Sequence, residues 1–435
     1  MVISFYRLAL YLFLPVLLMR LVLRGFSNPG YWRRWRERFA LDRKSLHPAD
    51  LWVHAVSVGE VRAASPLILA ILERSPGLRV VVTTMTPTGA DQLRKSLQDK
   101  VRHCYAPYDY PGAVARFLAR VRPSLLIVLE TEIWPNIVTA CHRHDTPVIF
   151  TNARMSARSH RGYRYLQSLI GPVLAKISGF GVQSQADAER LIDLGALASR
   201  VTVTGSIKFE VQLSPSLREV ALVERRQWGS AREVWVAGST HDGEEEMLLA
   251  VYDTAKRQHP KLLLVLAPRH PERFAAVVRL CRRAGYAVVR RTEQQGAIPH
   301  NTDIYVADTM GELPMFYSAS DVAYVGGSWT PVGGHNILEV CAVGVPVLFG
   351  PYMFNFSEIS KIVLQREAGR QVKTPNELAA ALHEYLDDAN LRFATGEAGR
   401  VVVEENRGAL QHTQTLLEPY LREVVASPKH SPGRL

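Results

Sequence analysis

Two acids and one lysine in the first half of the chain have types and positions suited to proton transfer. Glu60 lies at the start of a helix expected after one strand, Glu130 ends another predicted strand, and Lys208 follows a third. A carboxylate at a strand end can accept the proton of an attacking hydroxyl group. A lysine there can neutralise a carboxylate or a leaving phosphate. These three residues are therefore candidates for catalysis.

Each of the three residues also has an ordinary structural explanation. Glu60 follows Ser57 at the spacing of a capping box, and the helix dipole favours an acid in the first turn. Glu130 and the nearby Glu132 can be a solvated cap, and Lys208 can be a lone surface lysine. The residue types alone leave both interpretations open.

Glycine-rich turns in the second half predict a site for a nucleotide phosphate. Gly326-Gly327-Ser328 ends a predicted strand, and Gly333-Gly334-His335-Asn336 is expected to open a helix. Backbone N–H groups at such glycines and at a helix N-terminus bind anions. Glu339, in the first turn of that helix, could hold ribose hydroxyl groups or form a capping box with Asn336.

Two further segments follow other predicted strands of this half. Pro268-Arg269 offers a guanidinium group to a nucleotide, and Asp308-Thr309-Met310-Gly311 offers backbone groups. The sequence contains no Asp-x-Asp pair of the kind that holds a metal against a nucleotide, so Arg269 and Lys208 are the cations available instead. The four cysteines are far apart, without zinc-ligand spacing. We therefore expect no metal site, no cofactor and free thiols.

Short β-branched segments alternate with helical patterns after residue 50, as is typical of parallel sheets covered by helices. A polar, proline-containing stretch around 212–217 interrupts the alternation. The predicted strands are 51–55, 79–84, 101–105, 124–130, 147–152, 179–183 and 201–205 before it, and 233–240, 261–269, 286–290, 303–308, 321–327 and 345–350 after it. Two doubly wound α/β domains of this kind are expected to place ligands in a cleft between the carboxyl ends of their sheets.

Length, composition and charge narrow the class of protein. A chain of 435 residues suits two domains of about 200 residues, and 47% hydrophobic with 21% charged residues is typical of a folded chain. The net charge of +11 is uneven, because residues 20–44 hold seven arginines and Lys44 against Glu37 and Asp42, or 8 − 2 = +6. Since this excess adjoins an apolar segment, a membrane is favoured over nucleic acid as partner.

The apolar segment Leu8–Met19 is uncharged but short, with about 18 Å of helix against about 30 Å of hydrocarbon. It spans a membrane only if the stretch from Val2 to Leu23 joins it, with Arg7 and Arg20 reaching the two interfaces. A tilted signal anchor and an interfacial helix both stay open. No small-residue cleavage site follows, and the arginine block is expected to face the cytoplasm and anionic lipid.

Eight motifs in order, from about residue 5 to about residue 420, carry a family resemblance. The motifs are HAVSVGEV (54–61), VTTMTPTGA (82–90), ETEIWPN (130–136), NARMSARS (152–159), VTGSIKF (203–209), APRHPERF (267–274), DTMGEL (308–313) and GGSWTPVGGHNILE (326–339). The chain resembles the 3-deoxy-D-manno-octulosonic acid (Kdo) transferases, glycosyltransferases of lipid A and lipopolysaccharide biosynthesis. Other glycosyltransferases of the fold share only a looser glycine-rich turn and glutamate.

The resemblance implies a GT-B glycosyltransferase fold of two Rossmann-like domains. It implies inverting, metal-independent transfer of Kdo from CMP-Kdo to a hydroxyl group of a tetraacylated lipid A precursor (lipid IVA). Glu60 would be the general base, and Glu130 and Lys208 would stabilise the transition state. CMP would contact Pro268, Arg269, Thr309, Met310, Gly311, His335, Asn336, Ile337 and Leu338, to which the ribose argument adds Glu339.

Four segments are expected on this basis. They are an N-terminal membrane anchor (1–30), an acceptor-binding domain (31–212), a CMP-sugar-binding domain (213–426) and a disordered tail (427–435). The expected location is the inner, cytoplasmic membrane, with both domains on its cytoplasmic face. The expected partners are CMP-Kdo, the lipid A precursor and the anionic membrane surface.

A basic stripe is a hypothetical site for the phosphates of the acceptor. The arginines that form it, spaced three or four residues apart, would share one face of a helix: Arg154, Arg158, Arg161 and Arg164. A solvated basic face is the alternative explanation.

Two other functions fit parts of the sequence. A nucleotide-sugar epimerase of the same build also needs acids and a phosphate site, but it has little use for a membrane anchor. A membrane-tethered nucleotide-binding protein without turnover would leave the acids and cations without a purpose. A dinucleotide oxidoreductase is disfavoured, because no GxGxxG follows the first strand of either half.

Overall fold

The structure is a computed structural model that describes residues 2–43, 45–211 and 213–426. The chain divides into two compact units. Of the described residues, the first unit contains those up to 210 together with 408–426, and the second contains those from 211 to 407.

The first unit is built on a seven-stranded, fully parallel sheet in the order β3-β2-β1-β4-β5-β6-β7. Its strands are β1 Leu51–His54, β2 Val80–Thr84, β3 Arg102–Tyr105, β4 Leu125–Leu129, β5 Val148–Ala153, β6 Gly179–Val182 and β7 Val201–Val203. The strand order reverses between β1 and β4, which is where ligands bind in open α/β sheets. Glu60 and Glu130 follow these two strands.

Helices cover both faces of this sheet, so the central strands are buried on both sides. Alternate residues of β1 enter two different cores, with Trp52 in one and Leu51 and Val53 in the other. Proline at the first turn begins α4, α5 and α6. The helices are α3 Val58–Arg74, α4 Pro87–Leu97, α5 Pro111–Val121, α6 Pro135–Arg143, α7 Ala157–Arg164, α8 Gln167–Leu174 and α9 Gln185–Asp193.

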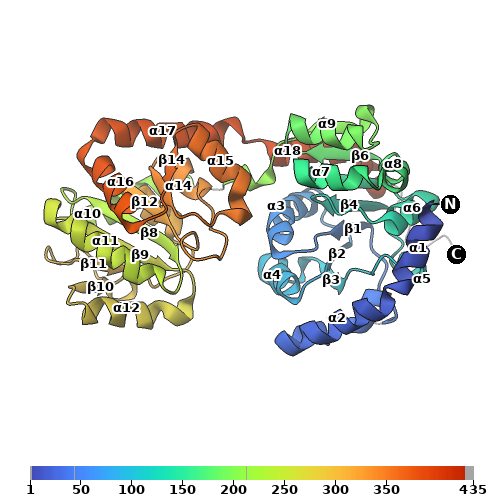
Figure 1. The fold of residues 1–435 in the computed structure, drawn as a ribbon, viewed down its shortest axis with the longest axis horizontal. Helices are drawn as coiled ribbons and strands as arrows, with labels where there is room; N and C mark the ends of the chain where they lie inside the picture. Colours follow the sequence, from blue (N-terminus) through green and yellow to red (C-terminus); the bar gives the residue numbers. More distant parts are fainter. Residues whose placement is uncertain (1, 44, 212, 427–435) are drawn as a thin grey trace. The chain divides into compact units, whose positions relative to one another are not determined.

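The N-terminal segment forms two helices, α1 (Val2–Leu12) and α2 (Leu14–Ser27), beside the first unit (Figure 1). Among the described residues no single helix is long and apolar enough to cross a membrane, although these two, bent by 47°, meet the length and composition together. Arg7 Nε donates to Asn136 Oδ1 at 2.8 Å, so α1 is tied to the first turn of α6. Helices α1 and α2 fall within the first compact unit.

The second unit contains another seven-stranded parallel sheet, in the order β10-β11-β9-β8-β12-β13-β14. Its strands are β8 Val234–Thr240, β9 Leu263–Pro268, β10 Val288–Arg290, β11 Ile304–Val306, β12 Val322–Val325, β13 Val347–Phe349 and β14 Gly369–Gln371. The edge strand β14 was not predicted, because Gly-Arg-Gln has no β-branched residue. The helices are α10 Leu217–Trp228, α11 Glu244–Gln258, α12 Phe274–Arg283, α13 Leu313–Ser318, α14 Leu338–Ala342, α15 Ser357–Gln365, α16 Pro375–Asp387 and α17 Ala389–Glu405.

The C-terminal boundary differs from the predicted end of the second domain at 426. Helix α17 ends at Glu405, α18 (Ala409–Ala426) begins after it, and Gly408 between them has φ 90°. Helix α18 belongs to the first unit, where Leu417 and Val424 enter the core and Tyr420 Oη donates to the Ser178 carbonyl (Figure 1). The predicted tail, 427–435, lies outside the described residues.

Candidate active site

The turn after β1 holds Glu60 in a fixed position at the start of α3. Ser57 caps this helix, and its Oγ accepts from the Glu60 N–H at 3.3 Å. The Glu60 carboxylate accepts from the Ser57 hydroxyl and from the Val56 N–H, both at 2.8 Å. The serine cap expected from the sequence is thus present, whereas the glutamate accepts from Val56 in place of the Ser57 N–H of a capping box. This arrangement also leaves the carboxylate only 5% exposed at the reversal point of the sheet.

The pKa of Glu60 is raised to about 8, first because burial disfavours the charged form and also because of the negative charges of Glu130 and Glu132. The hydrogen bonds from Val56 and Ser57 act in the opposite direction. The pKa of Glu132 is also raised by burial. Groups whose pKa is moved toward neutral pH are suited to general acid–base catalysis.

Glu130 and Lys208, which are far apart in the sequence, lie together in the structure. Lys208 Nζ is 3.5 Å from Glu130 Oε1, and both side chains are partly exposed. Glu130 has φ 56°, a left-handed conformation that is unusual for a residue other than glycine and is concentrated at functional sites. Asn152 Oδ1 accepts from the Ile207 N–H at 3.1 Å and so fixes the turn that carries Lys208. The role of Asn152 was not foreseen from the sequence.

In the glycine turn after β12, a carboxylate of the protein itself accepts the backbone N–H groups. The Glu244 carboxylate is fully buried and accepts from the N–H groups of Gly327, Trp329 and His241 at 2.8–2.9 Å. The Gly327 N–H belongs to the glycine turn for which the sequence predicted a nucleotide phosphate. At Gly327 that prediction is wrong, because the Glu244 carboxylate occupies the position of the anion.

The second glycine pair does not open a helix at once. Gly333 and Gly334 have φ 107° and 77°, and α14 begins only at Leu338. Asn336 Oδ1 accepts from the Leu338 N–H at 3.2 Å, and Asn336 Nδ2 donates to Glu339 at 3.2 Å. The predicted capping box is therefore replaced by an asparagine turn.

Three histidines meet at the carboxyl ends of β8, β9 and β12. His241 Nε2 is 2.8 Å from His335 Nε2, and the His241 ring is 5.2 Å from the His270 ring. Burial lowers the pKa of His241, and the charges of His270 and Arg269 lower it further. His241 was missed by the sequence analysis, although its place just after β8 at the reversal of strand order could have revealed it.

The remaining predicted nucleotide contacts fall into two groups. Arg269 and Met310 are at least partly exposed and lie after β9 and β11, at the same edge of the sheet as the histidines. Pro268, Ile337 and Leu338 are buried, so only their backbone groups could contact a ligand. Thr309 donates its hydroxyl to Glu312, and Gly311 has φ 90°.

The predicted arginine stripe is shorter than expected. Arg158, Arg161 and Arg164 are exposed on α7, which begins at Ala157. Arg154 precedes the helix, and both its N–H and its carbonyl hydrogen-bond to the Thr131 hydroxyl. It therefore does not share the face of the other three.

Comparison with known proteins supports both the fold and the family. Residues 33–211 match the family described as 3-deoxy-D-manno-octulosonic-acid transferase (kdotransferase). The chain is 36% identical to a 3-deoxy-D-manno-octulosonic acid transferase of Haemophilus influenzae, over 97% of this chain and 99% of that protein.

Two solved structures are similar in fold alone. A glycosyltransferase of kitacinnamycin is 14% identical (TM-score 0.50; 86% and 99% of the two chains), and a UDP-GlcNAc 2-epimerase from Neisseria meningitidis is 12% identical (TM-score 0.55; 85% and 99%). Two Rossmann-like sheets with these neighbours define the GT-B fold class. The chain belongs to the 3-deoxy-D-manno-octulosonic acid transferase family.

Proposed function

We propose that this glycosyltransferase moves Kdo from CMP-Kdo to a hydroxyl group of a tetraacylated lipid A precursor, lipid IVA, in lipopolysaccharide biosynthesis. The observation that carries the proposal is the buried Glu60 carboxylate, whose pKa is raised to about 8 at the reversal point of the first sheet. A base for a sugar hydroxyl group works best when its pKa lies near the working pH.

The proposed chemistry is a single displacement with inversion at the anomeric carbon. Glu60 takes the proton of the acceptor hydroxyl while the oxygen of that hydroxyl group bonds to the anomeric carbon of Kdo. The bond from that carbon to the phosphate oxygen breaks, and CMP leaves with the electron pair. Lys208, held 3.5 Å from Glu130, supplies positive charge to the transition state.

The second unit is proposed to bind CMP-Kdo at the edge that carries His335, Arg269 and the 309–311 turn. Arg269 would pair with the phosphate, and Glu339 with ribose hydroxyl groups. Arg269 and Lys208 would neutralise the charge of the leaving phosphate in place of a metal ion, so transfer should continue in EDTA. An EDTA-sensitive reaction that is restored by a divalent cation would contradict this part of the proposal.

We also propose attachment to the cytoplasmic face of the inner membrane through α1 and α2. These helices expose large apolar side chains, among them Phe5, Leu12 and Phe26, and the exposed Arg33 and Arg36 follow them. Apolar surface beside basic residues is the pattern of binding to anionic lipid.

The exposed arginines of α7 are proposed to guide the acceptor headgroup. Replacing Arg158, Arg161 and Arg164 together by glutamine should raise the apparent acceptor KM about threefold, because exposed charge pairs are individually weak. Arg154 is tested separately, since it lies off the helix. An unchanged KM in the triple variant would remove the idea.

The function is tested by incubating detergent-solubilised protein with CMP-Kdo and lipid IVA. Release of CMP that depends on the acceptor supports transfer. Loss of CMP-Kdo that is independent of the acceptor, or tight binding of CMP-Kdo without turnover, would instead favour the epimerase or the binding protein. Nuclear magnetic resonance of the product reports the anomeric configuration and so tests inversion.

A further inference from the structure

Arg38 is a buried cation that the reaction described above does not use. Its side chain is 1% exposed, and its Nη1 donates to the Met85 carbonyl at 3.0 Å. Its Nε and Nη2 atoms are buried without a hydrogen-bond partner. The neighbouring Glu37 does not neutralise it, because that carboxylate accepts from Arg34 and from the Tyr105 N–H. The rings of Tyr31, Tyr105 and Tyr108 lie within 4.2–5.8 Å of the guanidinium group but carry no net charge. Because buried charges are normally paired, the unneutralised guanidinium group indicates a missing anion.

The backbone around Arg38 is arranged to keep it in this position. Arg38 lies in a short 3-10 helix (Trp35–Phe39), and the residues on either side of that helix, Arg34 and Ala40, have φ 58° and 50°. Left-handed residues other than glycine carry strain that a surface loop could avoid. The Arg38 guanidinium group also lies 4.2 Å from the centre of the Tyr105 ring.

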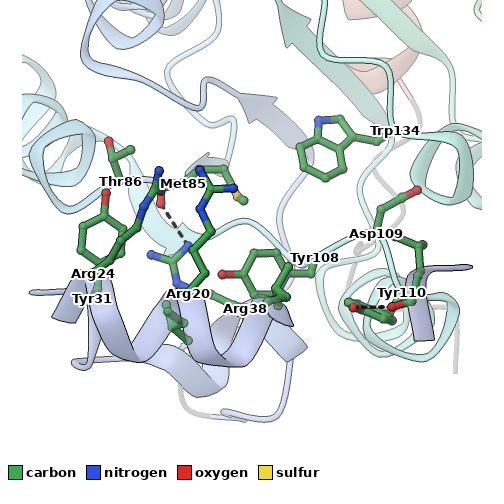
Figure 2. A pocket seen from close by; sticks show the side chains of 13 residues that line it. Arg20, Arg24, Tyr31, Arg38, Met85, Thr86, Tyr108, Asp109, Tyr110 and Trp134 are labelled. Atoms are coloured by element: carbon green, nitrogen blue, oxygen red, sulfur yellow. Dashed lines mark hydrogen bonds between the residues drawn. The ribbon is translucent and has the colours of Figure 1, made fainter. Parts of the chain in front are cut away.

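Arg38 lines a pocket of about 250 Å³ beneath α2, together with two further arginines (Figure 2). Figure 2 shows Arg20, Arg24 and Arg38 grouped near Tyr108 and Met85. Among the residues that the structure describes, no carboxylate forms an ion pair with any of the three arginines. Three unpaired guanidinium groups around one pocket fit a dianionic phosphate monoester.

The single acid that lines this pocket is already engaged. Asp109 Oδ2 accepts from the Tyr6 hydroxyl and the Asn136 N–H, both at 2.9 Å, and its Oδ1 accepts from the Ile137 N–H at 2.8 Å. It lies farther along the pocket, away from the arginines (Figure 2). It therefore ties α1 to the first unit rather than neutralising the arginines.

The apolar side of the pocket indicates a lipid as the carrier of the phosphate. Leu10, Leu17 and Leu21 line the pocket from α1 and α2. The same helices expose large apolar side chains on their surface: Phe5, Leu8, Leu12, Val16, Met19 and Leu23. An exposed apolar surface binds acyl chains, whereas a soluble phosphate compound makes no contact with it.

A short chain of hydrogen bonds connects the pocket with Glu60. Met85 accepts from Arg38 through its carbonyl, and its N–H donates to the Val56 carbonyl at 3.1 Å. The Val56 N–H in turn donates to Glu60. Trp134, on the opposite lining of the pocket, donates to Glu132 at 3.0 Å. The pocket therefore adjoins the acids of the candidate active site.

We propose that this pocket, with Arg38 inside and Arg20 and Arg24 at its rim, binds a phosphate monoester on the acceptor lipid. The assignment rests on the proposed function only in that the acceptor is a phosphorylated, acylated lipid. It places the acceptor's anionic group and its acyl chains against the first unit, with the hydroxyl group to be modified near Glu60.

The first experiment compares Arg20→Gln/Arg24→Gln and Arg38→Met with wild type on the acceptor lipid before and after enzymatic removal of its phosphates. Wild type should prefer the phosphorylated lipid at least about tenfold in kcat/KM. Both variants should raise the acceptor KM about tenfold, lose that preference and keep the donor KM. Arg143→Gln, an exposed arginine of α6 that does not line the pocket, is the matched control. A preference that persists in both pocket variants overturns the assignment.

The second experiment measures thermal unfolding in detergent, with and without lipid. Arg38→Met should unfold no earlier than wild type, because it removes an unpaired buried charge, and acceptor lipid should stabilise wild type but not this variant. An early-unfolding Arg38→Met protein that lipid still stabilises would show a structural role instead. If phosphatidylglycerol stabilises wild type as strongly as the acceptor through the same arginines, the pocket binds membrane phospholipid and the acceptor assignment fails.

The two proposals can fail separately. If no acceptor releases CMP from CMP-Kdo, the proposed function fails, while the lipid-dependent unfolding temperature still reports on the pocket. If transfer proceeds but shows no dependence on the phosphates of the acceptor, the pocket assignment alone fails.

Discussion

Glu60 in the first unit and Glu244 in the second lie at equivalent positions. Each is preceded by glycine, lies in the first turn of the helix that follows the first strand of its sheet, and is buried. Glu244 accepts three backbone N–H groups, and its acidic neighbour Glu245 pairs with Arg273 at 2.7 Å. Glu60 accepts one backbone N–H and one hydroxyl, and its acidic neighbours raise its pKa.

The difference teaches how one local pattern serves two purposes. A carboxylate saturated by backbone donors organises a loop, because its hydrogen bonds hold the surrounding turn. Burial and the charge of Glu245 raise the pKa of Glu244 as well, but three backbone N–H groups stabilise its charged form. Glu60 has fewer such donors and two acidic neighbours, so it keeps more of its affinity for a proton. We infer that Glu244 shapes the second site and that Glu60 reacts in the first.

Glu60→Gln should cause the largest loss of activity. Glutamine keeps the size of the side chain but cannot take a proton, so kcat/KM should fall about 10³-fold while the KM for CMP-Kdo stays unchanged. The measurement is acceptor-dependent CMP release. The matched control is Glu73→Gln, an exposed acid on the same helix. A folded Glu60→Gln protein with most of its turnover would rule out the base.

Glu244→Ala should instead cost stability in the second unit. Three buried backbone N–H groups lose their acceptor, and the cost should be about 2–4 kcal/mol in the free energy of unfolding. Urea unfolding measures it, and Glu246→Ala, an exposed acid of the same turn, is the control. Should Glu244→Ala unfold like wild type but lose catalysis as Glu60→Gln does, the contrast between the two glutamates would be wrong.

The pH dependence of kcat/KM and of stability tests the raised pKa of Glu60 in wild-type protein. As the proposed base, Glu60 acts only in its deprotonated form, so kcat/KM should rise about tenfold per pH unit and level off at about pH 8, and the Glu60→Gln profile should lack this rise. The folded protein binds a proton that the unfolded chain releases above pH 4.5. The stability contributed by Glu60 is therefore complete below pH 4.5 and is lost as pH rises through about 8. A profile already flat from pH 6 upward would contradict the raised pKa.

His241→Asn should have the smallest effect, confined to donor binding. His241 holds His335 through a 2.8 Å contact between Nε2 atoms. Loss of His241 should therefore let the side chain of His335, a proposed CMP contact, move. The KM for CMP-Kdo should rise about fivefold, or about 1 kcal/mol, with kcat nearly unchanged. His300→Asn, an exposed histidine of the same unit, serves as control. A fall in kcat without a change in KM would place His241 in the chemistry.

Much of the architecture could be predicted because it depends on local patterns. Buried strands of parallel sheets are continuous apolar segments, so thirteen strands were located from the sequence, and only the polar edge strand β14 was missed. The break between α17 and α18 was not located from the sequence, although Asn406 and Gly408 are both weak helix formers. That α18 packs on the first unit depends on contacts with α3 and β4, hundreds of residues away in the chain.

The sequence by itself determined the two-sheet class, the family resemblance and the candidate acids, because strand periodicity and motif order are properties of neighbouring residues. Only the tertiary structure decided which charges are neutralised. It satisfied Glu244 with distant backbone groups, brought Lys208 to Glu130, and left Arg38 buried without an anion in a block of arginines that looks uniform in sequence. Charge pairing and burial depend on the packing of remote segments, which no local pattern reports.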